Sequence, residues 1–336
     1  MSNPYFVIRE QCPACAFKAM KHLYQLPFDA PQITNYLTSF YGKQGGVELE
    51  YLRGADYQLC ECEQCGCIFQ REILNDILMG RLYESWIDPQ KLFDQHIRED
   101  DLNYFSYYAQ EIMQIAAFFH TTPSTLKFMD FGMGWGKWAL MAKAFGCKSY
   151  GAELSAERIA YAESNGIKVL QWDEMKGQDF DFINTEQVFE HISEPLLTLK
   201  HLAGALKPTG MVKISVPTAN DIDRRLKRMD WTAPKKAKDS LNPVAPLEHI
   251  NCYRRRSLVQ MAAKAGLAEV RIPMIHQYQY STNWSGLKQI AKNICRPIYR
   301  NILRRQNCLF FRKAPLTSAS RNSVQRAETE LTHTHI

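Results

Sequence analysis

The sequence lacks any apolar run close to the roughly 18 residues that a membrane-spanning helix requires, and no internal repeat is visible within its 336 residues. Its first residues, MSNPYFVIREQ, contain no basic stretch followed by an apolar one, so they do not predict a secretory signal. Hydrophobic residues make up 46% and charged residues 23%, as is ordinary for a globular protein. We therefore expect a cytoplasmic protein, long enough for one large α/β domain and a smaller unit.

Acidic residues outnumber basic ones in the first part of the chain, and basic residues outnumber acidic ones in the rest. Residues 1–125 hold 9 Lys and Arg against 16 Asp and Glu, whereas the remainder holds 32 against 19. The net charge of +6 therefore conceals an acidic front and a basic back. A basic surface attracts anionic partners such as a nucleotide-sugar, a lipid headgroup or a nucleic acid, but it is equally compatible with an ordinary solvated surface.

From residue 126 onward, short apolar stretches alternate with amphipathic ones. The stretches typical of strands are LKFMDF, CKSYGAEL, IKVLQW, DFINTE, MVKISV, AEVRIP and CLFFRK. The stretches typical of helices are WGKWALMAKAFG, SAERIAYAESNG, SEPLLTLKHLAGALKPTG and YRRRSLVQMAAKAGL. Repeated alternation of this kind predicts a parallel sheet that is covered by helices on both faces.

A glycine-rich turn follows the first of these strands. The strand ends at Asp130, and Gly132, Gly134 and Gly136 then lead into a helix, so a ligand can lie directly against the backbone. A dinucleotide fingerprint would require the third glycine one position later, where Lys137 stands. A carboxylate at the end of the strand is also awkward beside a pyrophosphate, whereas it suits a cationic cofactor.

These motifs resemble those of class I S-adenosylmethionine-dependent methyltransferases. DFGMGWG resembles their motif I, YGAEL the following acidic motif, FDFINTEQVFEHISEP the fourth-strand region and LKPTGMVKISVP the fifth strand. The resemblance continues through PLEHINCYRRRSLVQMAAKAGL and runs in order from about Tyr104 to Lys313. It implies an α/β, Rossmann-like fold with a mostly parallel seven-stranded sheet whose last strand is antiparallel. It also implies an enzyme that takes its methyl group from S-adenosylmethionine.

The resemblance assigns cofactor contacts to residues at the ends of strands and in the loops that follow them. These residues are Asp130, Gly132, Gly134, Gly136, Glu153, Asp173 and Gln187. The glycines would pass under the methionine part of the cofactor, and Asp130 would anchor that loop or the amino group. Glu153 would hold the ribose hydroxyls, Asp173 would approach the adenine amine, and Gln187 would lie where the fourth strand opens toward cofactor and substrate.

Six of the ten cysteines fall within residues 12–67. Cys12 and Cys15 form one C-x-x-C pair, and Cys62 and Cys65 form another that is followed by a glycine. Clustered cysteines in a large protein without a secretory signal more often bind metal than form disulfides. Two such pairs predict a closed, four-sulfur structural zinc site, in which Cys60 or Cys67 could replace a ligand. The arrangement resembles bacterial methyltransferases, including sugar methyltransferases, that carry an N-terminal zinc-binding region.

Methyl transfer requires a positioned nucleophile and, for many acceptors, a base that removes its proton. His191 in FEHISEP and His249 in PLEHIN are the candidate general bases, and a structural hydrogen bond is the alternative role for each. The stretch NTEQVF stands where methyltransferases of exocyclic base amines show (N/D)PP(Y/F), and no Pro-Cys pair of the cytosine-C5 type is present there. Methylation of nucleic-acid bases of these two types is therefore not expected.

Three functions remain open at this level. The preferred one is methylation of a small or carrier-linked acceptor, for example a sugar or surface-glycan precursor. The second is an RNA methyltransferase that holds RNA with the zinc module and the basic back half, although the cysteines lie in the acidic half. The third is a non-catalytic scaffold that binds S-adenosylmethionine. The oligomeric state is left open.

We expect a zinc-ribbon-like module over residues 1–75, a helical linker or lid over 76–125, the methyltransferase domain over 126–313 and a disordered tail over 314–336. Between Leu287 and Lys313 the sequence contains eight Lys or Arg and no Asp or Glu, with isoleucines at near-helical spacing. Covering of the sheet edge is the preferred role for this segment, and peripheral membrane contact through 284–305 is the alternative.

Overall fold

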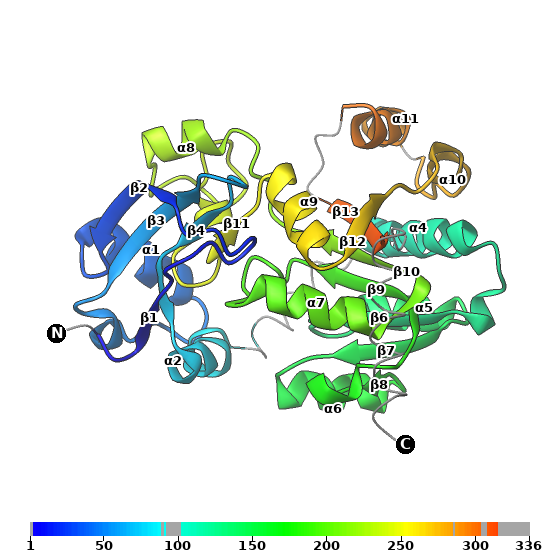
Figure 1. Ribbon diagram of the computed structural model, residues 1–336, viewed down its shortest axis with the longest axis horizontal. Helices are drawn as coiled ribbons and strands as arrows, with labels where there is room; N and C mark the ends of the chain where they lie inside the picture. The colour runs from blue at the N-terminus through cyan, green and yellow to red at the C-terminus, as the bar shows by residue number, and fades with distance from the viewer. Residues whose placement is uncertain (1–2, 89–90, 92–101, 285, 304–307, 315–336) are drawn as a thin grey trace, which may run out of the picture.

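The computed structural model describes residues 3–88, 91, 102–284, 286–303 and 308–314, in two parts that lie side by side (Figure 1). The larger part is built on a seven-stranded sheet in the order β12-β13-β10-β9-β6-β7-β8. Its strands are β6 (Lys127–Phe131), β7 (Lys148–Ala152), β8 (Lys168–Val169), β9 (Phe180–Glu186), β10 (Leu206–Ser215), β12 (Leu267–Val270) and β13 (Cys308–Lys313). β13 is antiparallel to both neighbours, while β10, β9, β6, β7 and β8 pair in parallel. The expected fold is confirmed.

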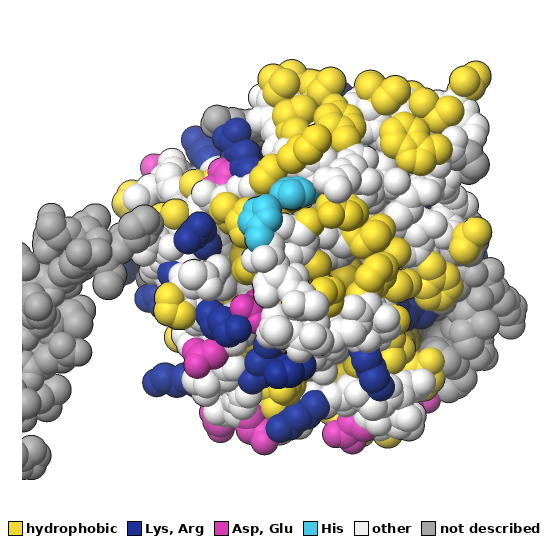
Figure 2. Space-filling model, turned by 90° about the vertical axis from the view of Figure 1, so that its right-hand side faces the viewer, with side chains coloured by type: hydrophobic (Ala, Val, Ile, Leu, Met, Phe, Trp, Pro, Cys, Tyr) yellow, Lys and Arg dark blue, Asp and Glu magenta, His cyan; other side chains and the backbone are white. Residues whose placement is uncertain are grey.

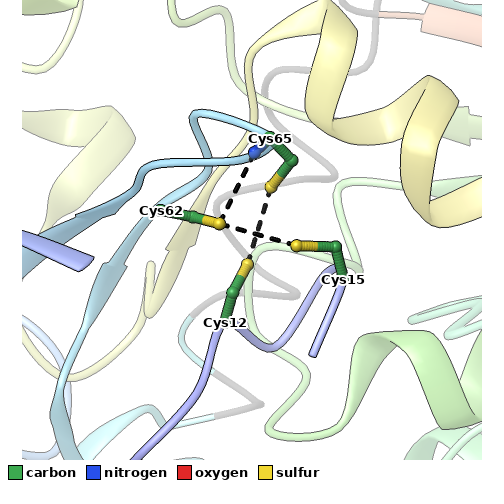
Figure 3. Close-up of side chains that lie close together, drawn as sticks. All are labelled: Cys12, Cys15, Cys62 and Cys65. Carbon is green, nitrogen blue, oxygen red and sulfur yellow. Dashed lines mark hydrogen bonds between the residues drawn. The ribbon is translucent and has the colours of Figure 1, made fainter. Parts of the chain in front are cut away.

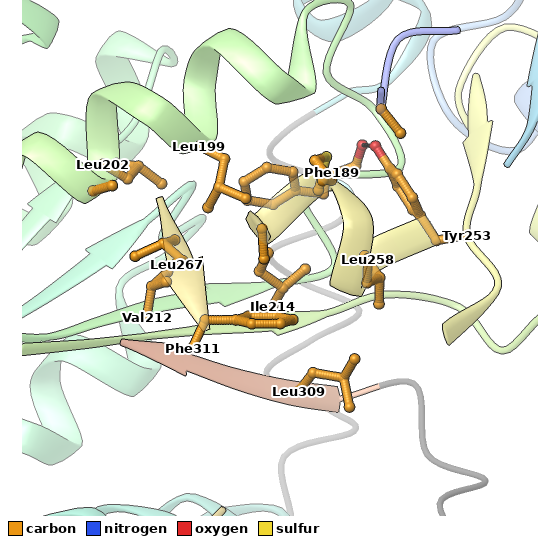
Figure 4. Close-up of a cluster of buried hydrophobic side chains, with 14 of the residues drawn as sticks. Phe189, Leu199, Leu202, Val212, Ile214, Tyr253, Leu258, Leu267, Leu309 and Phe311 are labelled. Carbon is orange, nitrogen blue, oxygen red and sulfur yellow. Dashed lines mark hydrogen bonds between the residues drawn. The ribbon is translucent and has the colours of Figure 1, made fainter. Parts of the chain in front are cut away.

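Helices cover both faces of this sheet. They are α4 (Leu102–Phe119), α5 (Lys137–Ala144), α6 (Ala156–Ser164), α7 (Pro195–Ala205) and α9 (Arg255–Lys264). Phe128 and Phe182, on adjacent strands, pack in one cluster with residues of α4 and α5. The next residues along those strands, Met129 and Ile183, pack in another cluster with residues of α7 and α9 (Figure 4). This alternation explains the nearly continuous apolar character of the strands, because both of their faces are buried.

One charged cluster is buried in this apolar sheet. Lys213 of β10 is fully buried, with its Nζ 2.8 Å from Oε1 of Glu111 and 2.5 Å from Oε2 of Glu186. The indole of Trp138 also donates a hydrogen bond of 2.9 Å to Glu111. The cation therefore links α4 to the end of β9, because it lies between a carboxylate from each.

The smaller part contains a four-stranded antiparallel sheet in the order β11-β4-β3-β2, with a separate β1-β5 pair. Its strands are β1 (Phe6–Ile8), β2 (Met20–Pro27), β3 (Asp56–Cys62), β4 (Ile68–Gln70), β5 (Glu72–Leu74) and β11 (Asn251–Cys252). Its helices are α1 (Pro31–Tyr41), α2 (Asp76–Arg81), the π-helical turn η2 (Leu82–Trp86) and α8 (Ile222–Arg228). The short 3₁₀ turns η1 (Leu49–Leu52) and η5 (Asn242–Val244) also lie in this part, whereas η3 (Pro123–Thr125) and η4 (Trp172–Glu174) belong to the larger one.

Residues far apart in the chain build this smaller part together. The edge strand β11 comes from the back half of the sequence and pairs with β4. Ile222 of α8 and Leu247 pack in the same buried cluster as Tyr57 of β3. The segment that follows β10 therefore returns to the N-terminal sheet and ties the two parts of the molecule to each other.

The basic segment near the end of the chain forms α11 (Leu287–Asn301), which packs beside α10 (Met274–Gln279). The expectation that its isoleucines cover the sheet edge is wrong, because Ile294 and Ile302 remain 49% and 64% exposed. Residues 285, 304 and 305 of the expected membrane-contact segment, and residues 315–336 of the expected tail, lie outside the described residues. Among the helices that the structure describes, none has the length and apolar character needed to cross a bilayer.

Candidate active site

The turn between β6 and α5 requires glycine at the positions that the sequence singles out. Gly132, Gly134 and Gly136 have φ values of 68°, 55° and 68°, in the left-handed region that favours glycine. A Cβ atom at Gly132 would also lie 2.7 Å from Cγ2 of Val188. The amide of Gly134 donates a hydrogen bond of 2.9 Å to Oε2 of Glu153, so the acidic residue after β7 helps to fix the turn.

This turn borders a pocket of about 340 Å³ at the carboxyl ends of β6 and β9. Its lining residues are Tyr104, Tyr108, Asp130, Gly132, Met133, Gly134, Trp135, Lys137, Trp138, Arg158, Asn184, Glu186 and Gln187. Four of the predicted cofactor residues are among them, and Glu153 contacts the lining through Gly134. Gly136 instead caps α5, and Asp173 is exposed in η4, away from the lining.

The floor of the pocket carries a buried carboxylate. Asp130 is 3% exposed, and its Oδ1 accepts a hydrogen bond of 2.7 Å from Nδ2 of Asn184. Burial raises the pKa of Asp130 to about 7, against the lowering effects of Asn184 and Lys213. Oδ1 of Asn184 is buried and has no hydrogen-bond partner among the described residues. Two oxygens that need a donor therefore face this site, which fits the amino group of S-adenosylmethionine.

Several lining residues were not expected from the sequence. Tyr104 and Tyr108 lie one turn apart on α4, and their hydroxyl groups are 2.9 Å from each other. Nothing in the helical pattern of this segment distinguishes a ligand-facing tyrosine from one that packs on the sheet. Trp135 and Lys137, in contrast, stand within the glycine motif itself, and their position in the sequence could have identified them.

The two candidate bases, His191 and His249, lie together with their ring centroids 4.9 Å apart. Nδ1 of His191 bonds at 2.9 Å to the carbonyl of Glu248, and Nδ1 of His249 bonds to the carbonyl of Asn242. A carbonyl oxygen only accepts, so both Nδ1 atoms carry the proton and both Nε2 atoms keep a free lone pair. Burial lowers the pKa of His191 to about 4 and that of His249 to about 3, so both rings are neutral near pH 7.

A buried carboxyl group lies beside these rings. Glu190 is 1% exposed, and neither of its carboxylate oxygens has a hydrogen-bond partner among the described residues. Burial raises its pKa to about 8. Its Oε1 lies 3.8 Å from Nε2 of His191, and one ligand atom from each of Glu190, His191 and His249 lies within 4.8 Å of the others. This spacing suits a ligand that donates several hydrogen bonds, and it also suits a metal ion.

The histidine cluster is close to the cofactor pocket. β9 ends at Glu186, Gln187 lines the pocket, and His191 follows four residues later. Gln187 has a φ of 54°, which is unusual for a residue other than glycine, and its amide donates 2.8 Å to the carbonyl of Ser215. Strained backbone of this kind is common where a loop must present groups to a ligand.

Tyr83 of η2 lies beside the histidine cluster. Its ring contacts that of His191 edge-on, with centroids 6.3 Å apart. Burial raises the pKa of Tyr83, the negative charges of Glu248 and Glu190 raise it further, and Arg158 lowers it. The smaller part of the molecule therefore contributes a side chain beside His191.

A buried network fixes the loop that carries His191. Nδ2 of Asn251 donates to the carbonyls of Phe189 and Ile192 at 3.0 and 2.7 Å. The guanidinium of Arg9 donates at 2.8 Å to Oδ1 of Asn251 and at 2.9 Å to the carbonyl of Ser193. Residues from the start, middle and back of the chain thus hold this loop in one conformation.

The four predicted zinc ligands lie together at the junction of the two parts (Figure 3). Sγ of Cys12 is 3.6 Å from that of Cys65, and Sγ of Cys15 is 3.5 Å from that of Cys62. Zinc–sulfur bonds of about 2.3 Å in a tetrahedron place sulfurs slightly under 4 Å apart, so the residues fit such an ion. Cys60 lies in β3 outside this group.

The second cysteine pair, Cys62 and Cys65, is anchored to helix α9 of the larger part. The carbonyl of Cys65 accepts hydrogen bonds of 2.8 Å from Nε of Arg256 and 3.0 Å from the hydroxyl of Ser257, both on α9. Gly66, which follows, has a φ of 70°, and a Cβ there would approach the Arg256 side chain to 2.5 Å. The glycine after the pair is therefore required both by its φ angle and by the close contact.

Comparisons with known proteins agree with this geometry. The model of a family described as a methyltransferase domain matches residues 101–272, which is more than half of the chain. The chain belongs to this family of methyltransferase domains. It is an S-adenosylmethionine-dependent methyltransferase.

Solved structures with a similar fold include several methyltransferases. The plantazolicin methyltransferase BpumL is 13% identical, with 70% of this chain and 95% of that chain covered and a TM-score of 0.45. A methyltransferase of Thermotoga maritima is 14% identical, with 66% and 95% covered and a TM-score of 0.38. PKMT2 from Rickettsia typhi, solved with S-adenosylhomocysteine, is 15% identical, with 58% and 50% covered and a TM-score of 0.38. None of the curated proteins matches this methyltransferase.

Proposed function

We propose that this methyltransferase methylates a small or carrier-linked acceptor rich in hydrogen-bond donors, such as a sugar or a surface-glycan precursor. One observation carries the proposal: ligand atoms of His191, His249 and Glu190 lie within 4.8 Å of one another, and neither carboxyl oxygen of Glu190 has a hydrogen-bond partner among the described residues. Buried polar groups without hydrogen-bond partners are costly unless a ligand supplies them. A polyhydroxylated molecule supplies several at once.

The proposed roles follow from the geometry of the cleft. When bound, S-adenosylmethionine supplies a methyl carbon that its sulfonium activates for in-line displacement. Asp130 and Asn184 would hold the amino group, the glycine turn would lie along the methionine part, and Glu153 would accept from the ribose. Asp173, whose side chain is exposed in η4, would approach the adenine amine.

His191 or His249 would accept the acceptor's proton at Nε2, because Nδ1 of each ring already donates to a carbonyl. The ring that takes the proton would become a protonated imidazole, and the deprotonated acceptor atom would be free to take the methyl group that the donor supplies, with S-adenosylhomocysteine as the leaving group. Tyr83 would orient the acceptor from the smaller part of the molecule.

We further propose that residues 1–75 form the zinc-binding module, with 76–125 as a linker and 126–313 as the catalytic domain. Cys12, Cys15, Cys62 and Cys65 would hold a structural zinc ion, because four sulfurs leave no open coordination position for water. The ion would hold the segment with Cys12 and Cys15 against α9. It would thereby also fix the smaller part of the molecule, which places Tyr83 beside the histidines.

The test uses purified protein, methyl-labelled S-adenosylmethionine and extract of the source organism, which is divided into small-molecule, lipid, RNA and protein fractions. Label in the small-molecule or lipid fraction supports the proposal, provided that a His249→Gln variant that binds the donor normally transfers at least about tenfold less. Label confined to RNA would favour an RNA methyltransferase instead. Tight donor binding without transfer to any fraction would favour a scaffold.

A further inference from the structure

The exposed face of α11 is a feature of the molecule that the proposed reaction does not use. Leu287, Ile294 and Ile302 are 87%, 49% and 64% exposed, and Ile298 and Leu303 are exposed beside them. Figure 2 shows hydrophobic side chains gathered along the upper edge of this side of the molecule, where Figure 1 places α10 and α11. Contiguous exposed apolar side chains of this kind mark an interaction surface.

The helix is held to the protein by a different side. Asn293 and Pro297 are its buried residues, and Nδ2 of Asn293 donates a hydrogen bond of 2.6 Å to the carbonyl of Asn283. The hydroxyl of Tyr278, on α10, donates 3.0 Å to the carbonyl of Ile294. Because 3.6 residues make one helical turn, positions 287, 294, 298 and 302 share a face beside the one that contacts the protein. The apolar face therefore stays open although the helix is anchored.

The other flank of this helix is cationic. Lys288, Lys292, Arg296 and Arg300 follow one another at intervals of four residues, and no Asp or Glu occurs between 287 and 303. Lys288 and Lys292 are exposed. Trp284 and Tyr299, which are 45% and 37% exposed, stand near the two ends of the helix. Aromatic side chains at this level and cations beside an apolar face are typical of helices that lie in the headgroup region of a bilayer.

We propose that α11 docks this methyltransferase onto an anionic lipid surface, with its apolar face in the headgroup region and its lysines on lipid phosphates. The charge pattern of α11 favours a bilayer over a second copy of this chain as the partner of its apolar face. Two copies of this chain meeting through it would bring like charges together without acidic partners on α11, whereas an anionic bilayer complements both the cations and the isoleucines.

The docking does not depend on which acceptor is methylated, so its test is separate from that of the proposed function. The full-length protein is sedimented with vesicles of phosphatidylcholine alone and of phosphatidylcholine with phosphatidylglycerol. We expect binding to the anionic vesicles, weaker binding to the neutral ones, and release by added salt. The same samples are examined for self-association by analytical ultracentrifugation.

Two variants separate the apolar and the electrostatic contributions. Ile294→Ser with Ile298→Ser should reduce partitioning at least about tenfold on anionic vesicles. Lys288→Gln with Lys292→Gln should reduce it about twenty-five-fold on anionic vesicles only, at about fivefold for each lysine. The matched control is Leu197→Ser with Lys200→Gln, an exposed apolar and an exposed basic residue of α7, which should bind as the unmodified protein does.

Cys295 offers an independent readout, because it is exposed on α11 while the other nine cysteines are buried. A polarity-sensitive fluorophore on Cys295 should shift to shorter wavelength with anionic vesicles. Absence of vesicle binding, or binding that neither variant weakens, would overturn the proposal. It would also be overturned if the isoleucine variant abolished a dimer of the unmodified protein while vesicles bound neither form.

Discussion

Nδ2 of Asn184 donates a hydrogen bond of 2.7 Å to Oδ1 of Asp130, across the neighbouring parallel strands β9 and β6. This contact orients the carboxylate at the floor of the pocket and leaves Oδ1 of Asn184 without a partner among the described residues. The pair thus combines one negative charge and one carbonyl oxygen where the amino group of the methyl donor is expected to bind. Its consequences can be measured without knowing the acceptor.

Asp130→Asn should weaken S-adenosylmethionine binding by about tenfold to a hundredfold, the usual effect of losing a charged hydrogen-bond partner. Because burial raises the pKa of Asp130 to about 7, the unmodified protein should bind the donor more tightly as the pH rises through 7. The variant should lose that dependence. Calorimetric titration between pH 6 and pH 8 checks both expectations, and an unchanged affinity would remove Asp130 from the cofactor site.

Cys62→Ser should abolish zinc binding and lower the melting temperature, because only three of the four sulfur ligands then remain. Cys60→Ser is the matched control, since Cys60 lies two residues away in the same strand, is also buried and stands outside the cluster. Elemental analysis should give one zinc per chain for the control and none for Cys62→Ser. A second equivalent that only His249→Gln removes would instead reveal a metal at the histidine cluster.

Lys213→Met should destabilise the protein by about 3 kcal/mol, because it leaves the buried carboxylate of Glu111 and the half-buried one of Glu186 without their cation. Lys207→Met serves as the control. Its Nζ is 2.7 Å from Oδ1 of Asp181, but the lysine side chain is 37% exposed, so its loss should cost less than about 1 kcal/mol. Urea denaturation measures both. Equal losses of unfolding free energy for the two substitutions would show that the buried ion pairs of Lys213 stabilise the protein no more than the exposed pair of Lys207.

The histidine cluster should make the protein sensitive to acid. The folded state depresses the pKa of His191 and His249. The two neutral rings therefore leave the free energy of unfolding undiminished above the ordinary histidine pKa of 6.5, and that stability is lost as the pH falls toward 4. Each ring should remove about 1 kcal/mol from the free energy of unfolding per pH unit in that window. Burial of Asp130 and Glu190 acts in the opposite direction, since their pKa values are raised.

The measurement is therefore a difference between proteins. Melting temperatures of the unmodified chain and of His249→Gln are compared from pH 7 to pH 4, with the exposed His22→Gln as a control. The His249 variant should lose less stability on acidification than the other two. Parallel curves for all three would contradict the assigned tautomer and burial of His249.

Local patterns in the amino-acid sequence determined much of this protein by themselves. The glycine turn after β6 could be recognised because its φ angles are a property of a few consecutive residues. The strand order followed from the β–α alternation and the resemblance to class I methyltransferases, since right-handed crossovers leave few alternatives. The two cysteine pairs were likewise visible, because each knuckle is set by a spacing of three positions.

Other features exist only in the tertiary structure, because they join segments that the sequence separates widely. β11 completes the N-terminal sheet, Tyr83 reaches His191, and Arg9 fixes the loop that carries this histidine, and no periodic pattern encodes such long-range contacts. The fold leaves Asp173 exposed in η4 and outside the pocket lining. It also decided that the apolar face of α11 remains open, because an amphipathic helix has the same sequence pattern whether a sheet, a membrane or solvent lies against it.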